Sequence, residues 1–166
     1  KGVKAGNIVD LKAAEHAIGQ AVLAAERMAA PYFKGSNLQR ITVNVPGHHT
    51  LSHHLSVDVK TQCHSVTEKD IACAIAQGKS VEIPGQDHLL HNIPAEYKLD
   101  KASGILDPIG MSGQNLSVRL SLITALSPTL NNINTAVGDS HLDVSNYCAA
   151  PYAAGLSTLV DDEKNL

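Results

Sequence analysis

Several features are scarce or missing in this chain, and each absence narrows the class of protein. Only three cysteines occur in 166 residues and none forms a CxxC pair, so a complete internal disulfide framework is impossible and the reducing cytoplasm is the expected compartment. No apolar run approaches the roughly 20 residues of a membrane span, and no basic region precedes one as in a signal peptide. The net charge of −3 comes without a basic block, which disfavours nucleic acid and anionic membrane as direct partners.

Motifs for catalysis and phosphate binding are missing as well. There is no GxSxG nucleophile elbow, and the serine of the GMSG sequence at 110–113 is expected in a tight loop between two strands. The acidic residues at 161–163 are consecutive, which is typical of a solvated turn rather than of an acid–base pair. GxxxxGK[ST], GxGxxG and the actin-type DxGGGT hairpin do not occur. The sequence therefore predicts no catalytic residue and no bound cofactor in this segment.

Nine histidines are the most conspicuous feature that is present, and several fall in one short stretch together with Cys63: His48, His49, His53, His54 and His64. A structural zinc site needs four nitrogen or sulfur ligands that converge tetrahedrally. Adjacent residues on a strand point to opposite faces, so His53 and His54 cannot chelate as a pair. We expect solvated or packed histidines and no metal, and we keep a small His-rich metal-binding domain as the alternative function.

Hydrophobic periodicity predicts a long helix followed by a strand at the start of the chain. Asp10 can cap the helix, Pro31 is expected to end it, and the apolar stripe consists of Leu11, Ala14, Ile18, Ala21 or Val22, Ala25 and Met28. A β-rich run at 41–45 follows and closes at the Pro-Gly pair 46–47. Helix then strand is therefore the expected opening unit.

The middle of the chain is predicted to fold as strand, helix, strand and strand, at 51–59, 67–78, 88–99 and 116–125. In the first of these strands apolar and polar residues alternate, which is typical of a half-exposed antiparallel strand. Thr67 and Asp70 form a start like a capping box for the helix, and a Gly/Pro-rich loop is expected at 104–113. Helix, strand and helix follow after Ser127. The order suggests an α/β domain interrupted by a compact insertion, with boundaries near Gly47 and Ala125.

Residues 90–113 read LHNIPAEYKLDKASGILDPIGMSG and fit the pattern LHxxPxxYxxDxxxGxxxPxGMxG. This pattern strongly resembles the bacterial cell-division FtsA family. The stretches GVKAGNIVD at 2–10, AAERMA at 24–29 and VTEKD at 66–70 are similar to further family segments. The resemblance covers essentially the whole chain, and the alphaproteobacterial branch looks nearest.

The resemblance implies an α/β (α+β) fold: part of an actin-like, ribonuclease H-like subdomain with an inserted strand-helix-strand-strand (SHS2) subdomain. Residues 1–46 and 126–166 would be part of subdomain 1A, and residues 47–125 would be subdomain 1C. The chain begins without an initiator Met and is expected to be an excised segment. Subdomain 2B, the phosphate hairpins and the membrane helix of the family would lie outside it.

The resemblance implies an adaptor that binds ATP and Mg in the intact protein, polymerises, and tethers FtsZ to the cytoplasmic side of the inner membrane at the division site. We expect no enzyme activity from this segment and no direct membrane contact. The sequence AAPYAAG at 149–155 resembles the family relatives' E-P-x-A-A-A segment, with Ala150 in place of the acidic residue that polarises the attacking water. Hydrolysis is therefore expected to be feeble even in the intact protein.

The expected partners, by the same resemblance, are neighbouring FtsA subunits in a filament and late division proteins such as FtsN, both through subdomain 1C. FtsZ would bind only through parts outside the segment. Two sets of candidate partner-binding residues follow: the polar loop residues Glu82, Gln86, Asp87 and His88, and the strand residues Ser52, His54, Ser56 and Asp58. A purely structural segment without a partner surface is a third possibility. Because an incomplete sheet exposes its edges, we also expect the segment to be prone to aggregation.

Overall fold

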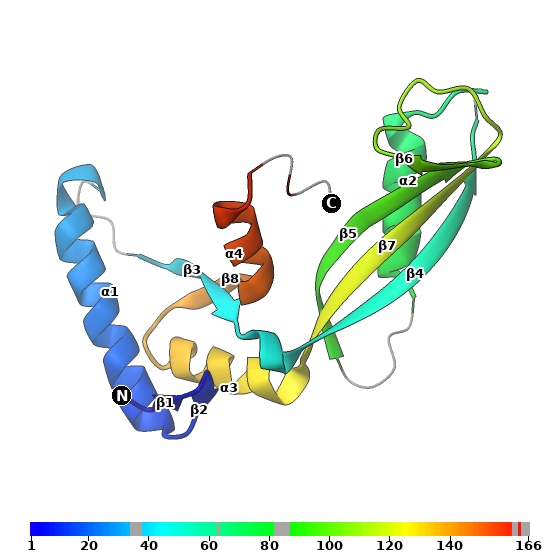
Figure 1. The fold of residues 1–166 in the computed structure, drawn as a ribbon. Coiled ribbons are helices and arrows are strands. Elements are labelled where there is room, and N and C mark those ends of the chain that lie inside the picture. Colours follow the sequence, from blue (N-terminus) through cyan, green and yellow to red (C-terminus); the bar gives the residue numbers. More distant parts are fainter. Residues whose placement is uncertain (34–37, 63, 82–86, 161–162, 164–166) are drawn as a thin grey trace. The chain divides into compact units, whose positions relative to one another are not determined.

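The computed structural model describes residues 1–33, 38–62, 64–81, 87–160 and 163. Its internal contacts divide the chain into two compact units (Figure 1). We call residues 1–50 with 125–166 the split unit, because it consists of the two ends of the chain, and residues 51–124 the inserted unit.

The split unit is built around a parallel pair of strands, β3 (Arg40–Val45) and β8 (Asp143–Ala149). Helices α3 (Ser127–Gly138) and α4 (Ala150–Thr158) contact β8, and α3 also contacts α1 (Leu11–Phe33). Its smaller elements are the antiparallel strands β1 (Val3–Lys4) and β2 (Asn7–Ile8) and the 3-10 helix η1 (Gly47–His49). Val45 and Ala149 face each other across the sheet and are both buried, so this end of the pair belongs to the core.

Helix α1 starts as predicted but differs from the prediction at its other end. The Asp10 carboxylate accepts a hydrogen bond from the amide of Ala13 at 3.1 Å, which caps the helix. Pro31 does not end it: the helix continues to Phe33, because a proline in the last turn removes only one backbone hydrogen bond. The expected apolar stripe is buried at Ala14, whereas Met28 is 81% exposed.

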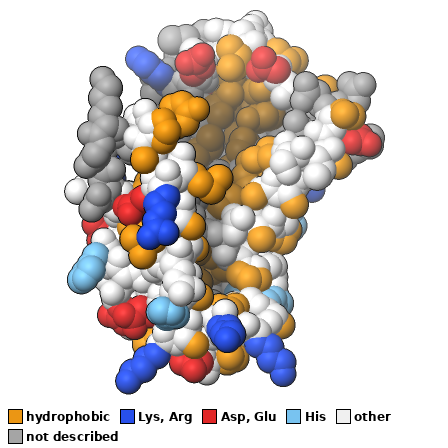
Figure 2. Space-filling view, turned by 90° about the vertical axis from the view of Figure 1, so that its left-hand side faces the viewer, with side chains coloured by type: hydrophobic (Ala, Val, Ile, Leu, Met, Phe, Trp, Pro, Cys, Tyr) orange, Lys and Arg blue, Asp and Glu red, His pale blue; other side chains and the backbone are white. Residues whose placement is uncertain are grey.

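The other positions of that stripe in the second half of α1 are half-buried at Val22 and exposed at residues 21 and 25, so this part of the stripe is not fully buried. A hydrogen bond joins the first part of α1 to the segment that follows α3: the Ser140 hydroxyl donates to the carbonyl of Glu15. Figure 2, which views the side of the molecule on which α1 lies, shows exposed hydrophobic side chains on that face. Periodicity predicts which side chains share a helix face and not whether another element covers that face.

The inserted unit is a four-stranded sheet in the order β4-β7-β5-β6 with helix α2 along one side (Figure 1). Its elements are β4 (Thr50–Lys60), α2 (Glu68–Lys79), β5 (Asp87–Leu99), β6 (Ala102–Ile105) and β7 (Asn115–Leu126). The predicted order of strand, helix, strand and strand is present. One correction is needed, because the stretch predicted as a loop at 104–113 begins inside β6, a short strand that pairs antiparallel with the end of β5.

The core of the inserted unit lies between β7 and α2. Leu116, Val118, Leu120 and Leu122 of β7 are buried, as the alternating pattern predicted, and Arg119 between them is exposed. The helix approaches closely at Gly78, where an added Cβ would lie 2.3 Å from a methyl carbon of Leu120. The glycine is therefore required by the close approach of helix and sheet.

Two features of the sheet leave strand edges open. β4 is an outer strand, and β6 reaches only as far as Tyr97 on β5 in the pairing that the structure records. Pro94 lies in the part of β5 before this pairing, and an edge position is where proline is tolerated in a sheet.

Candidate protein-interaction surfaces of the inserted unit

The polar residues predicted on the first strand lie where the alternation placed them. The side chains of Ser52, His54, Ser56 and Asp58 are exposed, while Val57 between them is buried. Since β4 is an outer strand, these four residues lie on the edge strand of the sheet and on the face that α2 does not cover. The structure therefore brings this predicted set together on one polar surface.

Charged groups from two further strands share this open face. Arg119 of β7 forms an ion pair with Glu96 of β5 at 2.5 Å, and Lys98 lies 4.0 Å from the same carboxylate. These three residues line, with Ser56 and Ser117, a small hollow of about 70 Å³. Two cations around one carboxylate make this face polar and leave this group of three with a net positive charge.

The second predicted set is only partly within the described residues. Glu82 and Gln86 lie outside them. Asp87 and His88 are the first two residues of β5; Asp87 is half-buried and His88 is exposed. Their role in partner binding stays a prediction.

The structure separates the histidines of the cluster. His48 and His49 lie in η1 with ring centroids 4.0 Å apart, while His53 and His54 occupy opposite faces of β4. Burial, together with the neighbouring His48, lowers the pKa of His49. Within the described part of the chain, no group of three or more His, Cys, Asp or Glu residues is placed to hold a metal ion, and Cys63 lies outside that part.

At the end of the inserted unit, two loop segments run side by side and tie β4 to β7. The amide of Val66 donates to the carbonyl of Met111, and the amide of Gly110 donates to the carbonyl of Val66, both at 2.9 Å. The hydroxyl of Thr61 donates to the carbonyl of Gly113 at 2.6 Å. We call this end, formed by residues 60–62, 64–66 and 100–115, the tip.

Five of the ten fixed positions in the LHxxPxxYxxDxxxGxxxPxGMxG pattern have a structural role at or near the tip. The Asp100 carboxylate accepts hydrogen bonds from the amides of Gln114 and Asn115, which lowers its pKa. Gly104 and Gly110 have positive φ angles of 72° and 80°. Two further positions of the pattern, Pro108 and Gly113, are packed: Pro108 is fully buried, and a Cβ on Gly113 would lie 2.4 Å from the side chain of Leu99.

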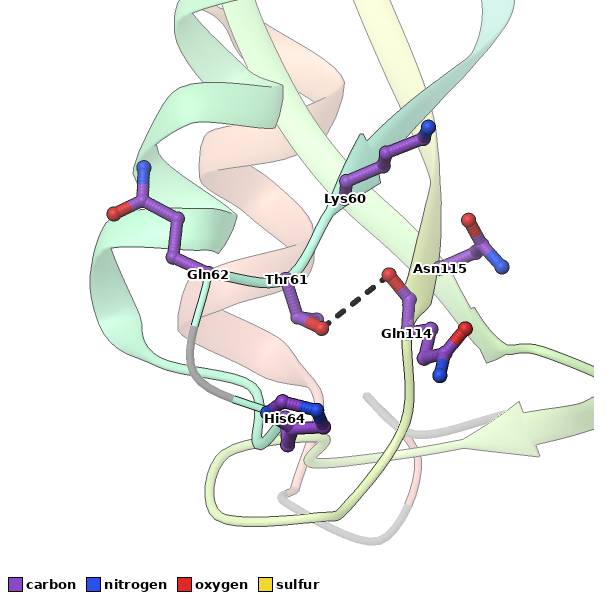
Figure 3. Close-up of a pocket in the computed structure, with 6 residues that line it drawn as sticks. All are labelled: Lys60, Thr61, Gln62, His64, Gln114 and Asn115. Atoms are coloured by element: carbon purple, nitrogen blue, oxygen red, sulfur yellow. Dashed lines mark hydrogen bonds between the residues drawn. The ribbon is translucent and has the colours of Figure 1, made fainter.

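A shallow polar pocket of about 300 Å³ opens at the tip (Figure 3). Its lining comes from the end of β4, the following loop and the start of β7: Lys60, Thr61, Gln62, His64, Gln114 and Asn115. The dashed line in Figure 3 is the bond from the Thr61 hydroxyl to the carbonyl of Gln114, at 3.3 Å. The described lining residues provide a cation, an imidazole and three side-chain amides, and none of them is a carboxylate.

Three large apolar side chains are exposed on the loop that leads to this pocket. Leu106 is 77% exposed, Ile109 48% and Met111 40%. The loop is held in place by its own bonds, since the Asp107 carboxylate accepts from the amide of Ile109 at 3.0 Å and Met111 donates to the carbonyl of Pro108. Sequence reasoning missed this feature, because isolated apolar residues in a loop have no periodicity.

No helix in the described part of the chain is long and apolar enough to cross a membrane.

Comparison with known proteins places this geometry in a family. Residues 47–124 match the family described as "SHS2 domain inserted in FTSA". The whole chain is 36% identical to the cell division protein FtsA of Rhizobium meliloti, 34% to that of Agrobacterium fabrum, and 30% to that of Bacillus subtilis. The chain spans only 36% of the length of the first two of these relatives and 37% of the third. Two of the three are alphaproteobacterial, as the resemblance predicted.

The fold is also found in a solved structure of low sequence similarity. A chain of the PilM-PilN type IV pilus biogenesis complex covers 93% of this chain with a TM-score of 0.55 and 13% identity, while this chain covers 39% of it. The predicted fold class is confirmed: part of an actin-like subdomain with an SHS2 insertion. The SHS2 match over residues 47–124 and the agreement over its full length support the identification of this chain as a segment of an FtsA-type cell division protein.

Proposed function

We propose that this chain is the part of an actin-like division adaptor that recruits other division proteins through the inserted unit. The observation that carries this proposal is the open edge and polar face of β4 in a chain of this family. An outer strand offers unpaired backbone groups to an extended peptide, and its alternate side chains supply selectivity. The intact protein would tether FtsZ to the cytoplasmic side of the inner membrane, through parts outside this chain.

The partners that we propose are further FtsA subunits in a filament and late division proteins such as FtsN. Exposed Ser52, His54, Ser56 and Asp58 lie on one face of β4 beside Arg119, so a partner strand along β4 would meet hydrogen-bonding side chains as well as free backbone groups. Asp87 and His88 at the start of β5 are the second candidate contact.

ATP and Mg would serve assembly more than catalysis in the intact protein. Ala150 is the first residue of α4, directly after β8, and its methyl group has no acceptor that could orient a water molecule. In the complete protein, Ala150→Glu should raise ATP turnover at least about tenfold, since one well-placed hydrogen-bonding group contributes at least this much. Unchanged turnover with ATP binding intact would contradict this assignment.

The recruiting role is tested by titrating this chain against a fluorescent cytoplasmic-tail peptide of an FtsN-like partner, with chelator present. Saturable anisotropy change is the expected result. One variant replaces the four polar β4 residues by alanine, and a matched variant carries Asp87→Ala and His88→Ala. Selective loss in the first variant assigns binding to β4, and selective loss in the second assigns it to the start of β5. No binding by the folded parent chain would refute recruitment through this unit.

A further inference from the structure

We propose that the tip is a second docking site of the inserted unit, separate from the β4 edge, and that it takes an extended peptide segment in which apolar side chains flank carboxylates. The tip combines the exposed Leu106, Ile109 and Met111 with the polar pocket around Lys60 and His64. This inference rests on the proposed role of the inserted unit in binding partners.

The apolar side chains are presented by a fixed loop rather than by a loose one. Pro108, in the middle of the loop, is fully buried, and backbone hydrogen bonds to Val66 hold Gly110 and Met111. A loop held in one conformation loses little conformational entropy when a partner binds to it. Exposed apolar groups on such a rigid support are typical of a binding surface.

The pocket lining argues for an acidic partner. The lining residues provide the ammonium of Lys60, the imidazole of His64 and the amides of Gln62, Gln114 and Asn115. The nearby Asp100 carboxylate accepts hydrogen bonds from the amides of Gln114 and Asn115 and from the Asn115 side chain at 3.2 Å. Lys60 is the one formally charged residue among the described residues that line the pocket, and a carboxylate is the peptide group that pairs with an ammonium.

The apolar loop and the polar pocket are next to each other because their backbone segments pair. Ser65 bridges to Ser112, and the amide of Gly113 donates to the carbonyl of His64 at 3.1 Å. Met111 and His64 are consequently carried by neighbouring segments. One extended peptide that contacts both segments would therefore meet the exposed apolar side chains and the polar pocket together.

The test is a titration followed by ¹⁵N–¹H chemical shifts. The probe is the acetylated and amidated peptide Gly-Leu-Glu-Leu-Glu-Leu-Gly, with two matched peptides that replace Glu by Lys or Leu by Ser. The first peptide should shift the amide signals of residues 60–62, 64–66, 106–107 and 109–115. Both matched peptides should bind at least about tenfold more weakly, because they lose the charge match or the apolar contact.

Variants of the chain distinguish binding at the tip from non-specific hydrophobic association. Leu106→Ser and Lys60→Gln should each weaken binding of the acidic peptide, by about tenfold and about threefold respectively. Val81→Ser is the matched control, because Val81 is 42% exposed in the same unit but outside the tip, and it should leave binding unchanged. Equal binding of the Lys peptide, or shifts outside the tip only, would overturn the inference.

The FtsN-like tail peptide is added to a second sample in the same experiment. Shifts on β4 from the tail, without tip shifts from the acidic peptide, would leave the proposed function in place and remove the docking site at the tip. If the acidic peptide shifts signals of the tip while the tail peptide does not bind at all, the docking site at the tip is supported and the proposed recruitment through β4 is refuted.

Discussion

The carboxylate of Asp100 accepts a hydrogen bond from the backbone amide of Asn115 at 3.0 Å, and this bond ties the end of β5 to the start of β7. Asp100 has a positive φ of 52°, a conformation that Asp and Asn tolerate better than most residues. Asp100 therefore has two roles: it adopts the backbone conformation that the turn requires, and its carboxylate is the acceptor of the hydrogen bond to Asn115.

We predict that Asp100 makes the stability of the chain depend on pH. Its pKa is lowered by the amides of Gln114 and Asn115, so the folded state keeps the carboxylate ionised at a pH where the unfolded state takes up a proton. Stability from this group is present above about pH 4 and is lost as the pH falls below it. Asp100→Asn keeps the turn residue and removes the charge. Urea unfolding between pH 3 and 7 should show a smaller pH slope for this variant, and equal slopes would contradict the prediction.

Two glycine substitutions should have opposite effects on stability. A Cβ at Gly78 would lie 2.3 Å from a methyl carbon of Leu120, which is fully buried, so Gly78→Ala should cost about 1–3 kcal/mol through overpacking. A Cβ at Gly19 of α1 would meet nothing within 4 Å, so Gly19→Ala should stabilise by roughly 0.5–1 kcal/mol through helix propensity. Chemical denaturation of both variants measures the change in the free energy of unfolding, which should be opposite in sign. A stabilising Gly78→Ala would show that helix α2 is not packed this closely.

Leu106 should contribute almost nothing to stability although it is large and apolar. It is 77% exposed, so Leu106→Ser should change the free energy of unfolding by less than about 0.5 kcal/mol. Leu116, at 0% exposed, is the matched comparison, and Leu116→Ala should cost about 2–5 kcal/mol. Thermal unfolding distinguishes the two cases. A large loss from Leu106→Ser would mean that the loop packs against the chain instead of facing solvent.

Asn92 should stabilise the contact between α2 and β5. Its side-chain amide donates to the carbonyl of Ile75 at 2.8 Å, near the C-terminal end of the helix. Asn92→Ala should cost about 1–3 kcal/mol, because it removes this partly buried bond. Hydrogen exchange should speed up in the last turn of α2 more than in its first turn, where the Asp70 carboxylate bonds to Thr67. Uniform acceleration along the helix would argue against a local role.

The histidines should not retain zinc. His53 and His54 point to opposite faces of β4, and the Nε2 of His53 lies 3.4 Å from the Thr124 hydroxyl. After incubation with one equivalent of zinc and dialysis, elemental analysis should find far less than one zinc ion per chain. Retention of one equivalent, lost in a His53→Ala variant, would revive the metal-binding alternative.

The sequence predicted those elements whose pattern repeats. The alternation along β7 identified its buried leucines, and Thr67 with Asp70 marked the start of α2, where the carboxylate accepts from the Thr67 amide at 2.8 Å. Such signals are local, so they can be recognised without knowledge of the partners in the fold.

The features that the sequence did not predict depend on contacts between distant segments. β6 has only four residues and is a strand because β5 lies beside it. The exposure of Met28 depends on which elements cover α1, and the tip depends on the pairing of residues 61 and 64–66 with 110–114. Of the candidate site residues, the β4 set could be placed by alternation, whereas the tip required the three-dimensional structure.

The parallel pairing of β3 with β8 has a consequence for the order of folding. All of residues 46–142 lie between these two strands, and closing so long a loop costs much conformational entropy. The inserted unit shortens that path when it folds, because β4 and β7 are neighbours in its sheet and His53 and Thr124 then lie in contact near the points where the chain enters and leaves. The inserted unit should therefore fold first, and the sheet of the split unit should form in a later and slower kinetic phase.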